Sequence, residues 1–239
     1  MRFLKEIKDI FIIFLIIFVL RSSFINWYEI PTGSMIPTLK IGDHVVVNKL
    51  EYGFMLPFMS SRIMSWNSAK RGEIVVFRDP EEKTLWGTII PRNLIKRVVG
   101  VGGDKVQFIN GVLSVNNNPV KEELILDRAV LDDLEAIDRK KLNNKELIME
   151  SGASEKPHYI LRQRFGGRTN SDTRVWEIPK GKLLVVGDNR DDSLDGRFWG
   201  YINQTDLYGR AFMITYSIIK WDIIIPKFRK GRWFLKLTH

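Results

Sequence analysis

The sequence predicts a mostly β protein whose body follows an N-terminal transmembrane helix. An unbroken apolar run over residues 10–20 lies behind a basic start and predicts the helix. Beyond it, short runs rich in Val, Ile and Phe alternate with Gly-Asp, Arg-Gly and Asn-Gly pairs, a pattern typical of β-strands between tight turns. With 239 residues, of which 44% are hydrophobic, the chain can bury one sizeable core and an appended lobe.

The N-terminal apolar run must be extended before it can cross a bilayer. Residues 10–20 alone would form a helix about 16 Å long, whereas the hydrocarbon core is about 30 Å thick. Extension to residues 7–27 gives sufficient length, with Arg21 able to snorkel and Trp27 at headgroup level. The alternative is a cleaved secretory signal, which needs small residues at its cleavage site, yet the first alanine is Ala69. We therefore expect an uncleaved, single-pass anchor.

Basic residues at the start of the chain predict the orientation of this anchor. Arg2, Lys5 and Lys8 stand at its N-terminal end. Positive residues beside a transmembrane helix are retained in the cytoplasm. The N-terminus is therefore expected in the cytoplasm and the body on the outer side of the membrane.

The body reads as a series of short strands interrupted by one charge-dense segment. The predicted strands are residues 44–47, 73–77, 95–99, 105–109, 112–115, 183–186 and 211–219. Asn110-Gly111 separates two of them and predicts a hairpin, because this pair accepts the positive φ angles of a type I′ turn. Residues 121–150 are rich in charge and predict part of an inserted lobe, whose clustered acids form a solvated face. We expect a cytoplasmic stub and anchor over residues 1–28 and a β core formed by residues 29–115 and 183–225. An inserted lobe would cover residues 116–182, and a basic aromatic tail residues 226–239.

Composition excludes several classes of site. The absence of cysteine excludes disulfides, thiolate catalysis and cysteine-ligated metals. The three histidines are scattered, and residues 188–192 lack the alternating ligands of a calcium loop, so no metal is expected. The formal net charge of +9 suits nucleic acid or anionic lipid. Because both ends of the chain mix basic with aromatic residues, we expect lipid and not nucleic acid, although the tail could also be a solvated basic end.

Three polar segments could carry chemistry. Ser34 lies beside Gly33 in a proline-stiffened loop, where its backbone N–H and the Thr32 hydroxyl could face a developing oxyanion; the alternative is a plain surface turn. Lys96 lies within an apolar strand, where burial would lower its pKa and let it accept a proton; otherwise it faces water. Residues 186–197 read as a loop braced by Asp–Arg pairs.

These segments together resemble bacterial type I signal peptidases. Residues 33–39 (GSMIPTL) are similar to the nucleophile box of that family, residues 95–104 to its lysine box and residues 187–197 to its C-terminal box. Residues 42–49 and 71–77 also fit the family pattern. Each box is weak alone, but their order behind an N-terminal anchor makes the combination specific.

The resemblance implies a serine endopeptidase in which Ser34 is the nucleophile and Lys96 the general base, with no cofactor. Thr32 and the Ser34 N–H would form the oxyanion hole, and Ser193 would hydrogen-bond and orient the Lys96 amine. Four charged residues would support the site, with the last two as an ion pair: Asp188, Arg190, Asp195 and Arg197. Four apolar residues would line a shallow pocket for small side chains: Ile30, Met35, Leu39 and Ile95.

The resemblance also implies a fold, a location and partners. The fold would be a body of coiled antiparallel sheets with a variable second lobe, anchored in the cytoplasmic (inner) membrane with its body on the outer or periplasmic side. Its partners would be signal-peptide-bearing preproteins and membrane lipid. Gly196 departs from the family, which often has serine there, and residues 116–182 match poorly. Two other hypotheses are a Ser/Lys protease for another precursor, such as a pilus subunit or mitochondrial presequence, and a membrane-tethered binding domain in which Ser34 and Lys96 tolerate replacement.

Overall fold

The described part of the protein is mostly β-structure. The computed structural model describes residues 6–14, 23–55, 62–80, 84–85, 88–89, 92–126, 144–165, 167, 174–222 and 225–237. Every pair of named strands in these ranges is antiparallel. The predicted mostly β, antiparallel body is therefore confirmed.

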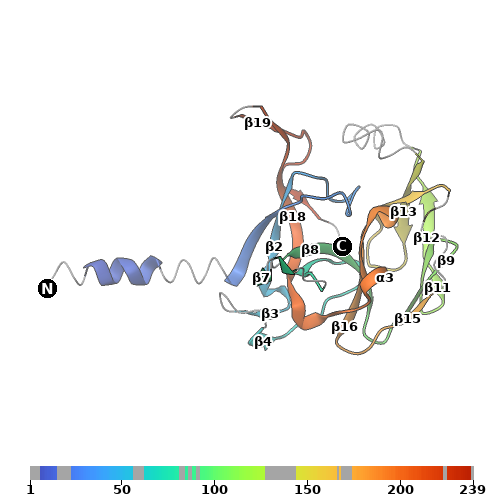
Figure 1. Ribbon diagram of the computed structural model, residues 1–239, viewed down its shortest axis with the longest axis horizontal. Coiled ribbons are helices and arrows are strands. Elements are labelled where there is room, and N and C mark those ends of the chain that lie inside the picture. The colour runs from blue at the N-terminus through green and yellow to red at the C-terminus, as the bar shows by residue number, and fades with distance from the viewer. Residues whose placement is uncertain are drawn as a thin grey trace.

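The largest sheet runs in the order β1-β2-β18-β5-β8-β16-β17, and β19 and β20 also pair with β18 (Figure 1). Its strands are β1 (Ile25–Glu29), β2 (Asp43–Asn48), β5 (Ile74–Arg78), β8 (Asn93–Val101), β16 (Lys182–Val186), β17 (Ile202–Asn203), β18 (Leu207–Asp222), β19 (Ile225–Phe228) and β20 (Leu235–Lys236). Strand β8 is flanked by β5 and β16. A side chain on β8 can therefore be shielded from water even when it is charged.

Two smaller sheets, one of four strands and one of three, form the other side of the body in Figure 1. A four-stranded sheet contains β11 (Asn118–Pro119), β10 (Val112–Val115), β9 (Lys105–Ile109) and β15 (Val175–Glu177), and a three-stranded sheet contains β12 (Lys121–Leu124), β13 (Lys145–Ser151) and β14 (His158–Gln163). Two short ladders are β3 (Gly53–Phe54) with β4 (Met64–Ser65) and β6 (Thr84–Leu85) with β7 (Thr88–Ile89). The short helices are η1 (Lys49–Glu51), η3 (Arg190–Asp192), α3 (Gly196–Trp199) and η4 (Gln204–Asp206).

The hairpin predicted from Asn110-Gly111 is present between β9 and β10. Val112 pairs with Ile109, and the two turn residues have φ angles of 51° and 83°. These positive values are the ones that Asn and Gly tolerate best. Strand β9 also pairs with β15, so two strands assigned to the core by sequence share a sheet with residues of the expected lobe.

Hydrophobic clusters connect the two groups of sheets. One cluster lies under β1, β2, β5 and β18 and includes Val45, Ile74 and Ile214. Another contains Phe108 and Trp176 from the four-stranded sheet together with Leu184 of β16. Strand β16 therefore packs against both groups, and the loop that follows it lies where they meet.

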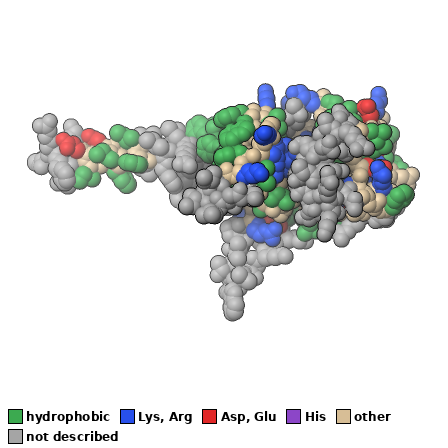
Figure 2. All heavy atoms as spheres, turned by 90° about the horizontal axis from the view of Figure 1, so that it is seen from above, with side chains coloured by type: hydrophobic (Ala, Val, Ile, Leu, Met, Phe, Trp, Pro, Cys, Tyr) green, Lys and Arg blue, Asp and Glu red, His purple; other side chains and the backbone are tan. Residues whose placement is uncertain are grey.

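The N-terminal segment differs in part from the predicted anchor. Residues 6–14 are helical and carry exposed apolar side chains, drawn in green in Figure 2. Residues 15–22, the middle of the predicted anchor, lie outside the described residues. Among the residues that are described, no helix has the length and hydropathy to cross a membrane. The expected helix to Trp27 is wrong at its end, because Ile25–Glu29 forms β1 and pairs with β2. The prediction reached Trp27 because residues 10–20 alone are too short to span a bilayer, although Arg21-Ser22-Ser23 already interrupts the apolar sequence before β1.

The C-terminal segment is part of the fold and not a free tail. Strands β19 and β20 pair with β18, and Leu237 lies in the core cluster. Arg232 is buried and donates to Asp43 Oδ1 at 3.0 Å and to the Thr38 carbonyl oxygen at 2.9 Å. The alternative of a solvated basic end is therefore wrong for Arg232, whereas Lys227, Lys230 and Lys236 are exposed.

Candidate active site

The loop that carries Ser34 is held at both ends by the main chain. Ile30 N donates to Asp43 O and Gly42 N donates to Ile30 O, both at 2.9 Å, which closes residues 31–42 into a loop between β1 and β2. Within it, Leu39 N donates to Met35 O at 2.9 Å. Both of these apolar side chains are fully buried. The loop is therefore anchored from below, while Ser34 stays at its surface.

Lys96 on β8 lies beside this serine. Its Nζ donates to Ser34 Oγ at 2.7 Å and to the Ile95 carbonyl oxygen at 3.0 Å. The residue is 4% exposed, because β8 lies between β5 and β16. The expected burial of Lys96 is confirmed, and the structure brings together two residues that are 62 positions apart in the chain.

Burial changes the chemistry of this lysine. It lowers the pKa of Lys96 to about 8, and the more distant carboxylates of Asp195 and Asp188 oppose the shift only partly. A lysine with this pKa is neutral in a useful fraction of molecules near neutral pH, and a neutral amine can accept a proton. Together with the 2.7 Å contact, this is the geometry of a nucleophile with its general base.

The expected ion pair between Asp195 and Arg197 is formed. Arg197 Nη2 donates to Asp195 Oδ2 at 2.8 Å, and both side chains are at most 3% exposed. Asp195 Oδ2 also accepts from Gly187 N at 2.9 Å, which holds the start of the 187–197 loop. Gly196 allows a close approach here, because a Cβ at this position would lie 2.8 Å from the Val185 carbonyl oxygen.

Asp188 and Arg190 support the site through partners that the sequence did not indicate. Asp188 accepts from Arg97 Nε at 2.8 Å and Nη2 at 2.7 Å, and from the Thr38 hydroxyl at 2.5 Å. Burial alone would raise the pKa of Asp188, but Arg97 outweighs burial and holds it below its ordinary value. Arg190 instead pairs with Glu150, whose Oε1 lies 2.6 Å from Arg190 Nη1.

Glu150 is the residue of this site that sequence reasoning missed most clearly. It lies on β13, in the segment to which nothing functional was assigned, and is fully buried. Burial favours its neutral form, but the charge of Arg190 and its hydrogen bonds outweigh burial and lower the pKa of Glu150 to about 2. A single Glu in a charged segment gives no sequence signal for a buried ion pair. Arg97 differs, because it lies inside the lysine box and its position there could have suggested a role at the site.

Ser193 lies in the site without the expected contact. Its hydroxyl is buried, and within the described residues it has no hydrogen-bond partner. The predicted hydrogen bond from Ser193 to the Lys96 amine is therefore not formed in this structure, where that amine contacts Ser34 and Ile95. The role of Ser193 as an orienting residue stays a prediction.

The expected oxyanion and pocket residues differ in their exposure. Thr32 is exposed, two positions before Ser34 in the same loop. The four expected pocket residues share one hydrophobic cluster: Ile30, Met35, Leu39 and Ile95. The first three are at most 2% exposed, and Ile95 is partly buried against them. They therefore form the floor under the site, and a lining role requires this floor to open. Within the described ranges, no group of three or more potential metal-ligating side chains comes together.

A family model and the curated relatives agree on one family. Residues 3–216 match the family described as "Signal peptidase, peptidase S26". Signal peptidase I of Buchnera aphidicola subsp. Acyrthosiphon pisum is 29% identical over 253 residues, covering 91% of this chain and 76% of the relative. Signal peptidase I of Pseudomonas aeruginosa is 33% identical over 221 residues, covering 88% and 71%. A solved signal peptidase I from Enterococcus faecalis V583 has a TM-score of 0.32 and 19% identity, over 61% of this chain and 98% of its own.

Proposed function

The chain belongs to the signal peptidase family, peptidase S26, a family of serine peptidases that remove signal peptides, and we propose that Ser34 and Lys96 are its catalytic pair. Its substrates are preproteins that bear signal peptides. The observation that carries the proposal is the 2.7 Å contact between Lys96 Nζ and Ser34 Oγ at a buried lysine. A surface lysine would keep its proton and could not serve as a base.

The proposed mechanism follows from this geometry. Ser34 Oγ attacks the scissile carbonyl carbon while its proton passes to the neutral Lys96 amine. The Ser34 N–H and the Thr32 hydroxyl stabilise the oxyanion. Lys96 then protonates the leaving amine, which breaks the peptide bond. In the second half it takes a proton from the water that attacks the acyl-enzyme and returns that proton to Ser34 Oγ as the ester bond breaks, which restores the neutral amine and the free hydroxyl. Ser193 is proposed to orient the amine once substrate excludes water.

We propose that cleavage follows small residues. The cluster of Ile30, Met35, Leu39 and Ile95 supports this, because its packed apolar floor would have to open to admit a side chain and a small side chain requires the least opening. In the proposed division, residues 29–115 and 183–225 are the catalytic core, residues 116–182 an inserted lobe, and residues 226–239 a C-terminal segment.

We also propose that residues 1–28 anchor the protein in the inner membrane, with the N-terminus in the cytoplasm and the body outside. Exposed aromatic residues in or just before β1 and in the C-terminal segment support contact with lipid: Phe24, Trp27, Phe228, Trp233 and Phe234. The chain has no cysteine, so single cysteines can report the topology without background. In intact spheroplasts, a membrane-impermeant maleimide should label Lys230→Cys and spare Lys8→Cys. The reverse pattern would refute the orientation.

The catalytic proposal is tested by cleavage of a preprotein in detergent by wild type, Ser34→Ala and Lys96→Ala. Wild type should cleave after the small residue, and each variant should lose at least about a thousandfold in kcat. If either variant cleaved the preprotein at the wild-type rate, the substituted residue would have no role in the mechanism. Failure of folded wild type on every exported substrate would refute the proposed substrate class.

A further inference from the structure

Lys145 is a buried lysine outside the proposed catalytic pair. It is the first residue of β13, in the expected inserted lobe, and its side chain is only 4% exposed. Its Nζ donates to Asn189 Oδ1 at 2.7 Å and contacts Asp192 Oδ2 at 2.5 Å. Both partners belong to the 187–197 loop. The lobe therefore places a cation inside the loop that surrounds the catalytic pair.

Asn189 in turn holds the main chain around the nucleophile. Its Nδ2 donates to the Gly33 carbonyl oxygen at 3.0 Å, and its backbone N donates to the Ser34 carbonyl oxygen at 3.1 Å. Gly187 permits this approach, since a Cβ there would lie 2.5 Å from Ser34 O. Asn189 thus bonds to the carbonyl groups of both Gly33 and Ser34, and Ile36 N also donates to Gly33 O at 3.2 Å.

The lysine fixes how this amide is used. An ammonium group only donates hydrogen bonds, so it must face the oxygen of the Asn189 side chain. The NH2 end is then left for Gly33 O, as observed. Without Lys145, the amide oxygen loses a buried partner and the side chain can rotate away from Gly33.

The restraint reaches the nucleophile through the geometry of the peptide bond. The Gly33–Ser34 peptide is planar, and in a trans peptide the C=O and N–H point in opposite directions. Holding Gly33 O therefore also fixes the direction of the Ser34 N–H. That N–H is the proposed oxyanion donor, and such donors act only when they are aimed in advance at the developing charge.

We propose that Lys145 is a positioning residue which, through Asn189, orients the Ser34 N–H for stabilisation of the oxyanion. The proposal rests on the proposed role of Ser34 as nucleophile. It assigns the inserted lobe a part in catalysis, because the cation comes from β13 and not from the core. Its effect is confined to the transition state, since the ground-state substrate carries no oxyanion.

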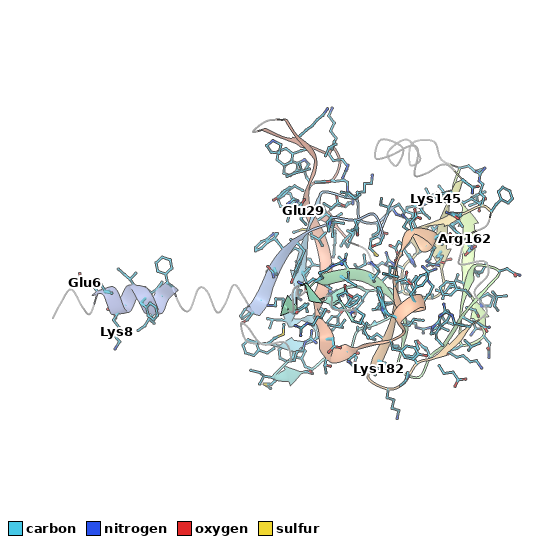
Figure 3. All side chains as sticks on the ribbon, viewed as in Figure 1. Glu6, Lys8, Glu29, Lys145, Arg162 and Lys182 are labelled. Carbon is cyan, nitrogen blue, oxygen red and sulfur yellow. The ribbon has the colours of Figure 1, made fainter. Side chains whose placement is uncertain are left out.

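The chain offers a matched control at Lys182. Lys182 Nζ donates to Asn203 Oδ1 at 2.5 Å, which is the same type of Lys–Asn contact between β16 and β17. Figure 3 labels both lysines and shows them on opposite sides of the body. Lys182→Met therefore measures the effect of losing such a contact away from the nucleophile.

The experiment compares wild type, Lys145→Met, Lys145→Arg and Lys182→Met in detergent. It measures kcat and KM on a lipid-tethered Ala-x-Ala peptide, the affinity for a peptide aldehyde that adds to Ser34 Oγ, and the unfolding midpoint. Lys145→Met should lower kcat by about tenfold to a hundredfold and leave KM within about twofold of the wild-type value. It should lower the affinity for the aldehyde by a factor similar to the loss in kcat. Lys145→Arg should recover most of the activity, and Lys182→Met should match wild type.

Asn189→Asp provides a second variant if Lys145→Met does not fold. It keeps an acceptor for Lys145 but replaces the NH2 group that donates to Gly33 O, so kcat should fall while the fold is retained. Unchanged kcat in either folded variant, or a loss of kcat with unchanged aldehyde affinity, would overturn the inference. An inactive wild type, or an active Ser34→Ala, would instead overturn the proposed function itself.

Discussion

At the scale of single residues, two neighbouring cationic side chains on β8, Lys96 and Arg97, have different hydrogen-bond partners. Arg97 places its guanidinium against both oxygens of Asp188 and remains an ion-paired structural element. Lys96, one position earlier, donates to two neutral oxygens, those of Ser34 and of the Ile95 carbonyl. Neutral acceptors compensate a buried charge less well than a carboxylate does. The lysine can therefore give up its proton, which an arginine does not.

The pKa of Lys96 sets the pH dependence of cleavage. Below its pKa the amine is protonated and cannot accept the Ser34 proton, so kcat/KM should rise with pH and reach half its maximum near pH 8. The measurement is kcat/KM from about pH 6 to about pH 10 on a peptide without titratable side chains. A profile that is flat across this range would contradict the role of Lys96 as base.

Burial of this lysine should also lower the stability of the fold. The folded pKa of about 8 lies below the ordinary lysine value of 10.5, so the unfolded chain binds the proton more tightly. The penalty is full below pH 8 and vanishes as pH rises through 10.5. Lys96→Met should thus abolish cleavage while raising the free energy of unfolding by up to about 3 kcal/mol near neutral pH. Denaturant titrations at about pH 7 and about pH 10 check this, and a gain that did not shrink at the higher pH would exclude burial of the charge as its cause.

How far sequence reasoning reached at this scale depends on where the partner of each residue lies. Ser34 and Lys96 lie in local patterns that resemble known boxes, so the amino-acid sequence alone was enough to name them. The partners of Asp188, Arg190 and Asn189 could not be named, because they lie about 40 to 90 positions away and only tertiary packing selects them. Ser193 shows the same limit, since its position in the loop does not determine its hydrogen bond.

At the scale of elements, η3 and β13 are joined by a buried ion pair. Arg190 and Glu150 are each 1% exposed and are joined by two hydrogen bonds. Backbone contacts run alongside, with Leu161 N of β14 donating to Asp188 O at 2.8 Å. The β13–β14 hairpin and the loop over residues 187–197 are therefore one packed unit.

Removal of one partner of this pair should be more damaging than removal of both. Glu150→Ala leaves the Arg190 charge buried and unmatched, which should cost about 3–5 kcal/mol of unfolding free energy. The double variant Glu150→Met, Arg190→Met removes both charges and should recover most of that loss. Denaturant unfolding measures all three proteins.

Glu122→Ala is a suitable control for this comparison. Glu122 also pairs with an arginine through two hydrogen bonds, to Arg162, but both side chains are 13–15% exposed. Its loss should cost about 1 kcal/mol. Equal costs for Glu150→Ala and Glu122→Ala would show that burial of the pair is not what matters.

Elements with local signals were predicted well, and those defined by distant pairing were not. The β9–β10 hairpin followed from Asn110-Gly111 alone. Strand β1 was absorbed into the predicted anchor, because the apolar run over residues 10–20 is too short to span a bilayer and the predicted helix was extended to Trp27. The C-terminal residues read as a tail because their basic character is visible in sequence, whereas Asp43, which binds Arg232, is 189 positions away.

At the scale of the whole molecule, the first strand of the body and its last two strands belong to one sheet. Strand β1 pairs with β2, β2 with β18, and β18 with both β19 and β20. Arg232 of the C-terminal segment also donates to the carbonyl of Thr38, in the loop that carries Ser34. The order of this segment should therefore be needed for the stability of the large sheet, in addition to its proposed contact with lipid.

This requirement can be tested with two leucines of the C-terminal segment. Leu237 is 5% exposed and belongs to the core cluster, whereas Leu235 is 41% exposed. Leu237→Ala should lower the free energy of unfolding by about 2–4 kcal/mol, because it removes buried methyl groups and leaves a cavity. Leu235→Ala should change it by less than about 1 kcal/mol. Denaturant unfolding in detergent gives both values. If the two variants were equally stable, the segment would be dispensable for the core and its aromatic residues would act at the membrane alone.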